Sequence, residues 1–272
     1  MRGARPERAL DAVVRNAVRF ARGVRVCVAC SGGPDSVALA AVLDRLARED
    51  GYDVVLAHVN HALRAGADQD ECVAFSVGAR LGRRVVAARL EVARADEATL
   101  RDARYAALAR IAGDAGACAV LTAHTAEDQT ESVLLALFRG TGLAGLAGIA
   151  ERRALTEHVE LVRPLLRVTH AELATELRRS ALPYALDPTN AQRRYRRNAL
   201  REPLDALRAE FPHLDRAVAR CAAIVRDELE GTPRAQARRA LRERLRAEAA
   251  LADVPFERIE AVRKAAERGT RP

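Results

Sequence analysis

Apolar runs typical of strands alternate with helix-type periodicity along the first 180 residues of the chain. The expected strands span 25–30, 53–60, 83–91, 117–124 and 159–166, and the expected helices span 35–49, 67–82, 98–116, 126–140 and 169–180. Strands separated by helices of this length are typical of a doubly wound, mostly parallel sheet. The pattern therefore predicts an α/β domain of about five strands with helices on both faces, in which ligands bind at the carboxyl ends of the strands.

The last quarter of the chain has a different character. From Asn198 onward the pattern is helical and rich in arginine, with a break at 230–236. We therefore expect a Rossmann-like domain over residues 1–200, followed by a small helical region over 201–272. No stretch approaches about 18 uninterrupted apolar residues, and no signal-peptide core follows the basic start, so we expect a cytoplasmic protein without a membrane span.

Charge and cysteine content narrow the function classes. The formal net charge is +8, which favours a polyanionic partner such as a nucleic acid, although all but one of the 45 Lys and Arg residues are Arg and many must lie on ordinary helix surface. Five scattered cysteines fit reduced, mostly buried thiols. Cys27 and Cys30 spell C-x-x-C, but residues three apart on a strand point to opposite faces, which argues against a shared metal or dithiol.

A glycine-rich turn, Ser31-Gly32-Gly33-Pro34-Asp35-Ser36, joins the first expected strand to the first helix. Because glycine lacks a Cβ atom, backbone N–H groups can approach an anion closely there, and the helix directs its positive end at the same point. Asp35 suits a phosphate site if a divalent cation such as Mg²⁺ bridges it to the phosphates. The alternative is a plain capped turn. We favour a phosphate-binding loop, which is not of the Walker A type.

This hexapeptide resembles the pyrophosphate-binding loop of the PP-loop ATPases. The resemblance implies cleavage of ATP between its α- and β-phosphates and adenylation of an oxygen atom on a substrate. It implies ATP binding by Ser31, Gly32, Gly33, Pro34, Asp35 and Ser36. The loop alone does not choose among amidating synthetases, tRNA thiolases and tRNA lysidine synthases.

Three further segments resemble the tRNA(Ile)-lysidine synthase family. They are AHVNHALR over 57–64, AHTAEDQTESVLLALFRGTGLAGLAGI over 123–149 and DPTNAQRRYRRNALR over 187–201. Arg101, Arg104 and Tyr105 form a smaller match. The resemblance covers roughly residues 24–230, with its motifs in the order that the family has.

The resemblance assigns roles to individual residues. It implies catalytic roles for Asp35, His124 and Asp128, with Asp35 and Asp128 as Mg²⁺ ligands. It implies contacts to tRNA or another substrate by Asn60, His61, Arg64, Arg104, Glu127, Tyr195, Arg197, Asn198 and Arg201.

The residue types of two segments fit these roles. His124 ends the fourth expected strand, and Glu127, Asp128 and Glu131 open the next helix, where acidic side chains are favoured; for Glu131 we prefer simple helix capping. Around Tyr195, arginines match phosphate geometry, and the tyrosine ring can stack on an unpaired base.

The implied activity joins L-lysine to C2 of the wobble cytidine, position 34, of the tRNA(Ile) with a CAU anticodon. ATP would adenylate the C2 oxygen with release of diphosphate, and the ε-amine of free lysine would then displace AMP. The oligomeric state stays open, a homodimer included. Two alternatives remain: a PP-loop tRNA thiolase, which needs a cysteine pair or an iron–sulfur site, and a non-catalytic tRNA-binding paralogue. Thr125, Glu127 and Leu186, which depart from the family pattern, motivate the paralogue.

Overall fold

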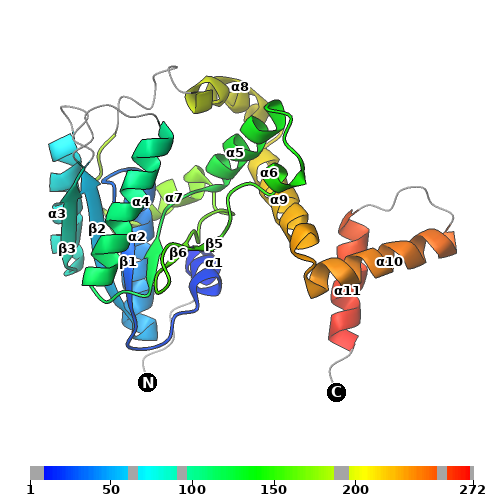
Figure 1. The fold of residues 1–272 in the computed structure, drawn as a ribbon, viewed down its shortest axis with the longest axis horizontal. Helices are drawn as coiled ribbons and strands as arrows, with labels where there is room; N and C mark the ends of the chain where they lie inside the picture. Colours follow the sequence, from blue (N-terminus) through cyan, green and yellow to red (C-terminus); the bar gives the residue numbers. More distant parts are fainter. Residues whose placement is uncertain (1–8, 61–66, 91–96, 187–195, 250–255, 270–272) are drawn as a thin grey trace. The chain divides into compact units, whose positions relative to one another are not determined.

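The sheet and its helices follow the predicted alternation. The computed structural model describes residues 9–60, 67–90, 97–186, 196–249 and 256–269. The strands are β1 Arg25–Ala29, β2 Asp53–Asn60, β3 Val85–Arg89, β4 Ala119–Leu121, β5 Arg152–Ala154 and β6 Glu160–Val162. The helices are α1 Ala9–Val18, α2 Pro34–Asp50, α3 Ala67–Leu81, α4 Glu97–Asp114, α5 Ala126–Phe138, α6 Leu143–Leu146, α7 His170–Ser180, α8 Arg196–Glu210, α9 Leu214–Glu230, α10 Pro233–Ala249 and α11 Phe256–Gly269. Figure 1 shows these elements along the chain.

Six strands form one sheet in the order β3-β2-β1-β4-β6-β5. Every neighbouring pair is parallel except β5 and β6. The expectation of a parallel, doubly wound sheet is confirmed, and β5 adds a short antiparallel edge. Because β5 has only three residues, all exposed and two of them arginine, it lacks the apolar pattern by which a strand is recognised.

The chain reverses its direction of travel across the sheet between β1 and β4. From β1 it runs to β2 and β3 on one side, and later to β4 and β6 on the other. Ligands of open α/β sheets bind at such a switch point, outside the carboxyl ends of the strands. The turns after β1 and β4 are therefore the first place to look for a site.

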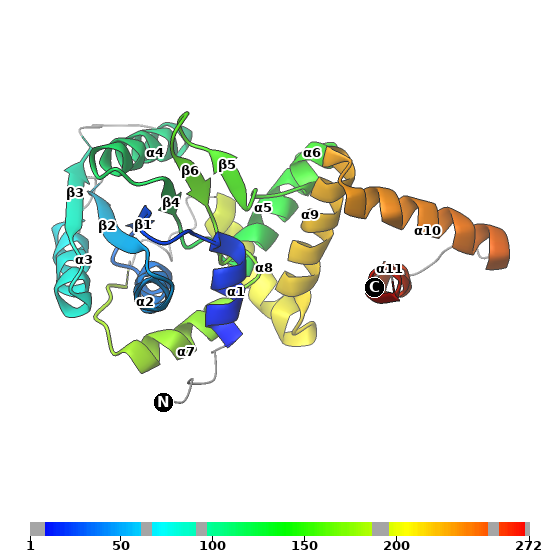
Figure 2. The ribbon, with the colours of Figure 1, turned by 90° about the horizontal axis from the view of Figure 1, so that it is seen from below.

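Two hydrophobic cores cover the two faces of the sheet. One contains side chains of α1, α2, α3 and α7, and the other contains those of α4. Figure 2 shows α4 on one side of the strands and α2 with α7 on the other. Val26, Val28 and Cys30 belong to the first core and Cys27 to the second. The prediction that Cys27 and Cys30 face opposite ways is confirmed.

Local residue choices fix the ends of α2, the helix at the centre of the first core. Pro34 occupies the first turn, where its missing N–H costs nothing. Gly51 ends the helix with a left-handed φ of 83°, and its N–H bonds to Ala47 O. The helix N-termini of successive βα units lie at the carboxyl rim of the sheet, so residues early in α2, α5 and α7 share one edge.

Contacts divide the chain into two compact units. The first comprises residues 1–132 and 149–219 and holds the sheet; the second comprises 133–148 and 220–272. The first unit continues past residue 200, and the predicted division at 200/201 stays a prediction. Within the second unit, the buried Arg238 guanidinium lies 3.1 Å from Asp227, 3.4 Å from Glu228 and 3.7 Å from Glu260. None of the helices in the described ranges is long and apolar enough to cross a membrane.

Candidate active site

The turn after β1 is held by its own hydroxyl groups. Ser31 N–H donates to Ser36 Oγ over 3.1 Å, and Ser36 Oγ donates to Gly33 O over 2.9 Å. Gly33 is the N-cap of α2 and has no side chain with which to cap this helix end; its own N–H donates to Ser31 Oγ over 3.3 Å. A helix start without a side-chain cap leaves backbone donors for a ligand, and the helix dipole favours an anion there. The geometry fits the predicted phosphate loop.

Gly32 sits where no other residue fits. Its φ is +86°, and a Cβ atom on it would lie 2.8 Å from Asp70 O. Its carbonyl accepts a hydrogen bond from Ala185 N–H over 2.8 Å. The glycine is therefore required by both backbone conformation and space, and the loop is tied to the segment just before residue 187.

The turn after β4 lies beside the phosphate loop, because β1 and β4 are adjacent parallel strands. Thr125 is placed before the first turn of α5. Its N–H donates to Asp128 Oδ2 over 2.9 Å, and Asp128 N–H donates to Thr125 Oγ1 over 3.4 Å. This reciprocal pair is a capping box with Asp in the place of Glu. Asp128 thus has a structural role at one carboxylate oxygen, in addition to the role that the sequence predicted.

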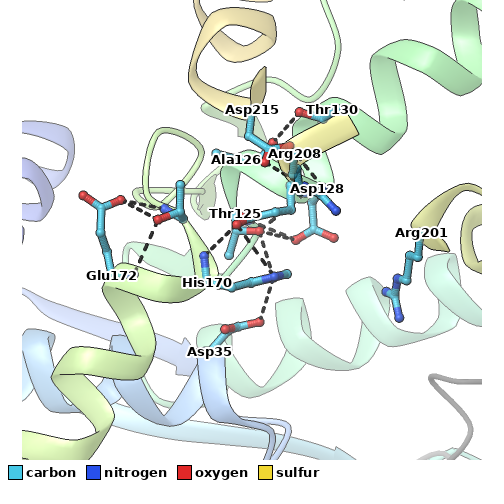
Figure 3. Close-up of polar contacts among 12 residues, drawn as sticks. Asp35, Thr125, Ala126, Asp128, Thr130, His170, Glu172, Arg201, Arg208 and Asp215 are labelled. Carbon is cyan, nitrogen blue, oxygen red and sulfur yellow. Dashed lines mark hydrogen bonds and ion pairs between the residues drawn. The ribbon is translucent and has the colours of Figure 1, made fainter. Parts of the chain in front are cut away.

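His170, which the sequence analysis did not single out, joins two of the predicted residues. Its Nε2 lies 3.4 Å from Asp35 Oδ2, and its backbone N–H donates to Glu127 Oε1 over 2.9 Å. Nε2 also lies 3.2 Å from Thr125 Oγ1. Figure 3 shows the imidazole ring between Asp35 on α2 and Thr125 before α5. The predicted strand over 159–166 gives a signal that could have found His170, because the helix after that strand must start at the carboxyl rim of the sheet.

A backbone contact fixes this arrangement. Ala126 N–H, in the first turn of α5, donates to Val168 O over 3.0 Å. Thr169 then caps α7 through a capping box with Glu172, so that His170 occupies the first helical position. The starts of α5 and α7 are thereby held side by side.

The site carries an excess of negative charge. Burial raises the pKa of Asp35; His170 opposes this, whereas Asp128 and Glu127 raise it further. Glu127 is buried, and its Oε2 has no hydrogen-bond partner among the described residues. Arg201 Nε donates to Glu131 Oε1 over 3.1 Å, an ion pair that the expectation of simple helix capping did not include. A buried carboxylate oxygen without a partner indicates a cation or a donor from a ligand.

The donor set at this rim fits Mg²⁺. Asp35 and Asp128 supply carboxylate oxygens, which Mg²⁺ prefers, and Glu127 adds the buried oxygen just described. No group of three or more His, Cys, Asp or Glu side chains in the described ranges forms a complete metal cage. Mg²⁺ commonly uses one or two carboxylates together with substrate phosphates and water, so two protein ligands suffice.

Three other predicted residues make contacts of their own near the sheet. Asn60, at the end of β2, donates to Asp68 over 3.1 Å and to Glu71 over 2.8 Å. His124 Nδ1 lies 2.9 Å from Thr122 Oγ1, beyond the end of β4. The Arg104 guanidinium lies 5.4 Å from the centre of the Tyr105 ring.

The remaining predicted substrate contacts belong to α8 or lie outside the described residues. Arg197 and Asn198 belong to α8, as does Arg201. The predictions for His61, Arg64 and Tyr195 lie outside the described residues.

Comparisons with known proteins agree with this geometry. Residues 5–206 match the PP-loop domain family. A tRNA(Ile)-lysidine synthase of Ralstonia nicotianae is 40% identical over 204 residues, covering 73% of this chain and 44% of the relative. One from Thermus thermophilus is 42% identical over 228 residues, covering 81% and 43%. The chain thus spans less than half of the length of these two relatives.

A solved structure shares the fold. The U34-tRNA thiolase NcsA from Methanococcus maripaludis superposes with a TM-score of 0.67 at 16% identity, covering 78% of this chain and 76% of the thiolase. At this identity the likeness concerns the fold alone. With the family match over most of the chain, the doubly wound sheet and the uncapped glycine loop at its switch point, the chain belongs to the PP-loop domain family.

Proposed function

We propose that this chain carries out the synthesis of lysidine. It binds ATP at the Ser31–Ser36 loop and transfers AMP to the C2 oxygen of the wobble cytidine of the tRNA(Ile) with a CAU anticodon, with release of diphosphate. The ε-amine of free L-lysine then bonds to C2 and displaces AMP. The observation that carries the proposal is the placement of the loop beside the acidic start of α5, in a chain similar to tRNA(Ile)-lysidine synthases. Such a protein works in the cytoplasm, where tRNA is modified.

In this proposal the phosphate loop holds the departing diphosphate. Backbone N–H groups at the start of α2 would bind its oxygens, and the Ser36 hydroxyl, which donates to Gly33 O, together with the Ser31 hydroxyl 3.1 Å from it, would hold the turn in shape. Donors that are already fixed by hydrogen bonds within the loop need little reorganisation when charge develops on the leaving group. The expected effect is faster cleavage between the α- and β-phosphates.

Asp35 and Asp128 would hold Mg²⁺ together with the phosphates. When bound, the ion supplies charge neutralisation on the phosphate oxygens. His170 would hold both Asp35 and Glu127 in place, because it contacts each of them. Asp128 keeps its orientation through its bonds to Thr125. The buried oxygen of Glu127 provides an acceptor for a cationic group, and His124 lies on the same rim.

The experiment combines the protein with ATP, Mg²⁺, L-lysine and a tRNA(Ile) transcript that carries the CAU anticodon. We expect AMP release that depends on both tRNA and lysine, and lysidine at position 34 by mass spectrometry of nucleosides. A tRNA(Ile) with a GAU anticodon is the matched control and should give no lysidine. AMP release that does not require lysine would contradict the proposal.

The two alternatives predict other results. A thiolase would show iron in the purified protein and transfer of sulfur to tRNA; Cys27 and Cys30 cannot hold one cluster together, because they face opposite sides of the sheet. A non-catalytic paralogue would bind tRNA with an affinity that Asp35→Ala leaves unchanged, and would release no AMP.

A further inference from the structure

A cluster of three arginines surrounds one tyrosine on the α4 face of the sheet. Arg163 follows β6, two residues after Leu161, so both side chains point to the same face. Arg153 of β5 pairs in register with Leu161, which belongs to the core under α4. Tyr105 of α4 belongs to the same core. Positions far apart in the sequence therefore bring Arg104, Arg153 and Arg163 to one ring.

The ring lies within reach of all three guanidinium groups. The distances from the Cζ atoms to the ring centre are 4.9 Å for Arg153, 5.4 Å for Arg104 and 6.0 Å for Arg163. Arg163 Nη2 donates to the Tyr105 hydroxyl over 3.2 Å, and Nη1 donates to Ala150 O over 2.8 Å. Cation–π contacts of this kind orient the guanidinium groups and leave their charge in place.

No acidic side chain in the described ranges forms an ion pair with any of these three arginines. The neighbouring acids are already engaged: Glu160 pairs with Arg152, and Glu151 pairs with Arg167 at 2.9 Å. Along the same short strand, Arg152 thus has a carboxylate partner and Arg153 has none. Three positive charges remain close together without a counter-charge.

Arg163 has a buried donor that is not satisfied within the cluster. Its side chain is 94% buried, yet its Nε has no hydrogen-bond partner among the described residues. Burial acts against ionisation of Tyr105, but Arg163, Arg104 and Arg153 outweigh it and lower the pKa of the phenol. The field at this point favours an anion. Arginine fits phosphate oxygens with its planar fork, whereas a lone chloride would use little of that geometry.

We propose that Arg104, Arg153, Arg163 and Tyr105 form a binding site for a backbone phosphate of an RNA substrate. The exposed Arg153 and the half-buried Arg104 would contact the phosphate, and the buried Arg163 and Tyr105 would position these guanidinium groups and hold positive charge beneath them. This inference rests on the proposed function for the identity of the RNA, and it adds Arg153, Arg163 and Tyr105 to the predicted RNA contacts. It lies on the opposite sheet face from the core of α2.

The test measures RNA binding separately from catalysis. A fluorescent RNA hairpin with the tRNA(Ile) anticodon stem and loop is titrated with the full chain at several salt concentrations. The variant is Arg153→Gln, which removes one exposed charge. The matched control is Arg84→Gln, an exposed arginine just before β3, at the amino end of the strands. Tyr105→Phe, which removes only the hydroxyl, is a second variant.

We expect Arg153→Gln to weaken RNA binding about three- to tenfold and to reduce the slope of log K against log salt by about one. Tyr105→Phe should weaken binding less, and Arg84→Gln should change it by less than about twofold. Equal effects of Arg153→Gln and Arg84→Gln, or no hairpin binding by the wild type, would overturn the inference. Hairpin binding with the expected slope but no lysidine formation would instead reject the proposed function and leave the phosphate site standing.

Discussion

The two turns that flank the switch point of the sheet are built in opposite ways. After β1, Gly33 opens α2 without a side-chain cap. After β4, the side chains of Thr125 and Asp128 cap α5, each accepting a hydrogen bond from the backbone N–H of the other. The first turn leaves backbone donors for an anion, whereas the second satisfies its own donors and presents acidic side chains. An anionic ligand and the acids that act on it can thus meet at one edge.

The start of α7 is capped in the same way as the start of α5, and it contacts both the α5 turn and the α2 turn. Thr169 and Glu172 form a capping box, and His170 then contacts Asp35 as well as Glu127. A capped helix start is stable without a ligand, and an uncapped one is completed by its ligand. The comparison predicts that loss of a functional side chain at the β1 turn affects activity first, and that loss of a cap at the other two turns affects stability first.

The largest effect should come from Asp35→Asn, which keeps the shape of the side chain and removes its charge. We expect the rate of AMP formation per enzyme to fall about a hundredfold or more, the scale of losing one electrostatic contact to the reacting groups. Asp114→Asn, an exposed acid at the end of α4, is the control. Equal rates of AMP formation for the two variants would contradict the expected importance of the β1 turn for activity.

The same variant should make the protein without ligands more stable. Burial raises the pKa of Asp35, so the ionised form is disfavoured in the folded state and costs stability above the ordinary carboxyl pKa. Asp35→Asn should therefore raise the free energy of unfolding at pH 7 in urea, and less so at pH 3. A loss of stability at pH 7 would contradict this reading of the acidic cluster.

An intermediate effect is expected for Gly32→Ala, with Gly23→Ala as its partner. Both glycines have a left-handed φ, +86° and +80°, but a Cβ at Gly23 meets no atom within 4 Å. Gly23→Ala should cost about 1 kcal/mol of unfolding free energy from backbone strain alone. Gly32→Ala adds a collision with Asp70 O and should cost about 3 kcal/mol. Urea unfolding measures both, and equal losses would show that space around Gly32 is unimportant.

The smallest effect concerns the cap of α7. Thr169→Ala should lower the free energy of unfolding by about 1 kcal/mol at pH 7. Burial acts against ionised Glu172, but its hydrogen bonds from Thr169 and its pairing with Arg216 prevail and lower its pKa. That contribution is present above the unfolded pKa of about 4.3 and is lost as the pH falls through the lower folded value. The cost of Thr169→Ala should therefore shrink at pH 3, and AMP formation at pH 7 should change little.

Sequence periodicity predicted the order of strands and helices in the sheet domain because buried strands carry continuous apolar runs. β2 spans Asp53–Asn60, as expected. β4 covers only Ala119–Leu121 of the expected 117–124. The apolar pattern shows which residues are buried, whereas a strand is defined by its hydrogen bonds to neighbouring strands. β5 was not predicted, since its arginines follow no strand pattern.

The candidate site could be predicted only where the residues are close in the sequence. The Ser31–Ser36 loop is one continuous segment, and its hydroxyl contacts follow from it. His170 and Asp35 are 135 positions apart in the sequence, and they meet because α2 and α7 start at the same rim of the sheet. Hydrophobic periodicity describes local structure only, so it could not predict this contact. The capping role of Asp128 was readable from Thr125 three positions earlier.

Gly32 connects the phosphate loop to two other segments of the chain. The Gly32 carbonyl accepts a hydrogen bond from Ala185, and the Gly32 backbone lies against Asp70 of α3. Three distant stretches of polypeptide therefore converge on this glycine. A nucleotide that binds the loop and not the unfolded chain should slow proteolysis in all three stretches together, in proportion to its concentration over its dissociation constant.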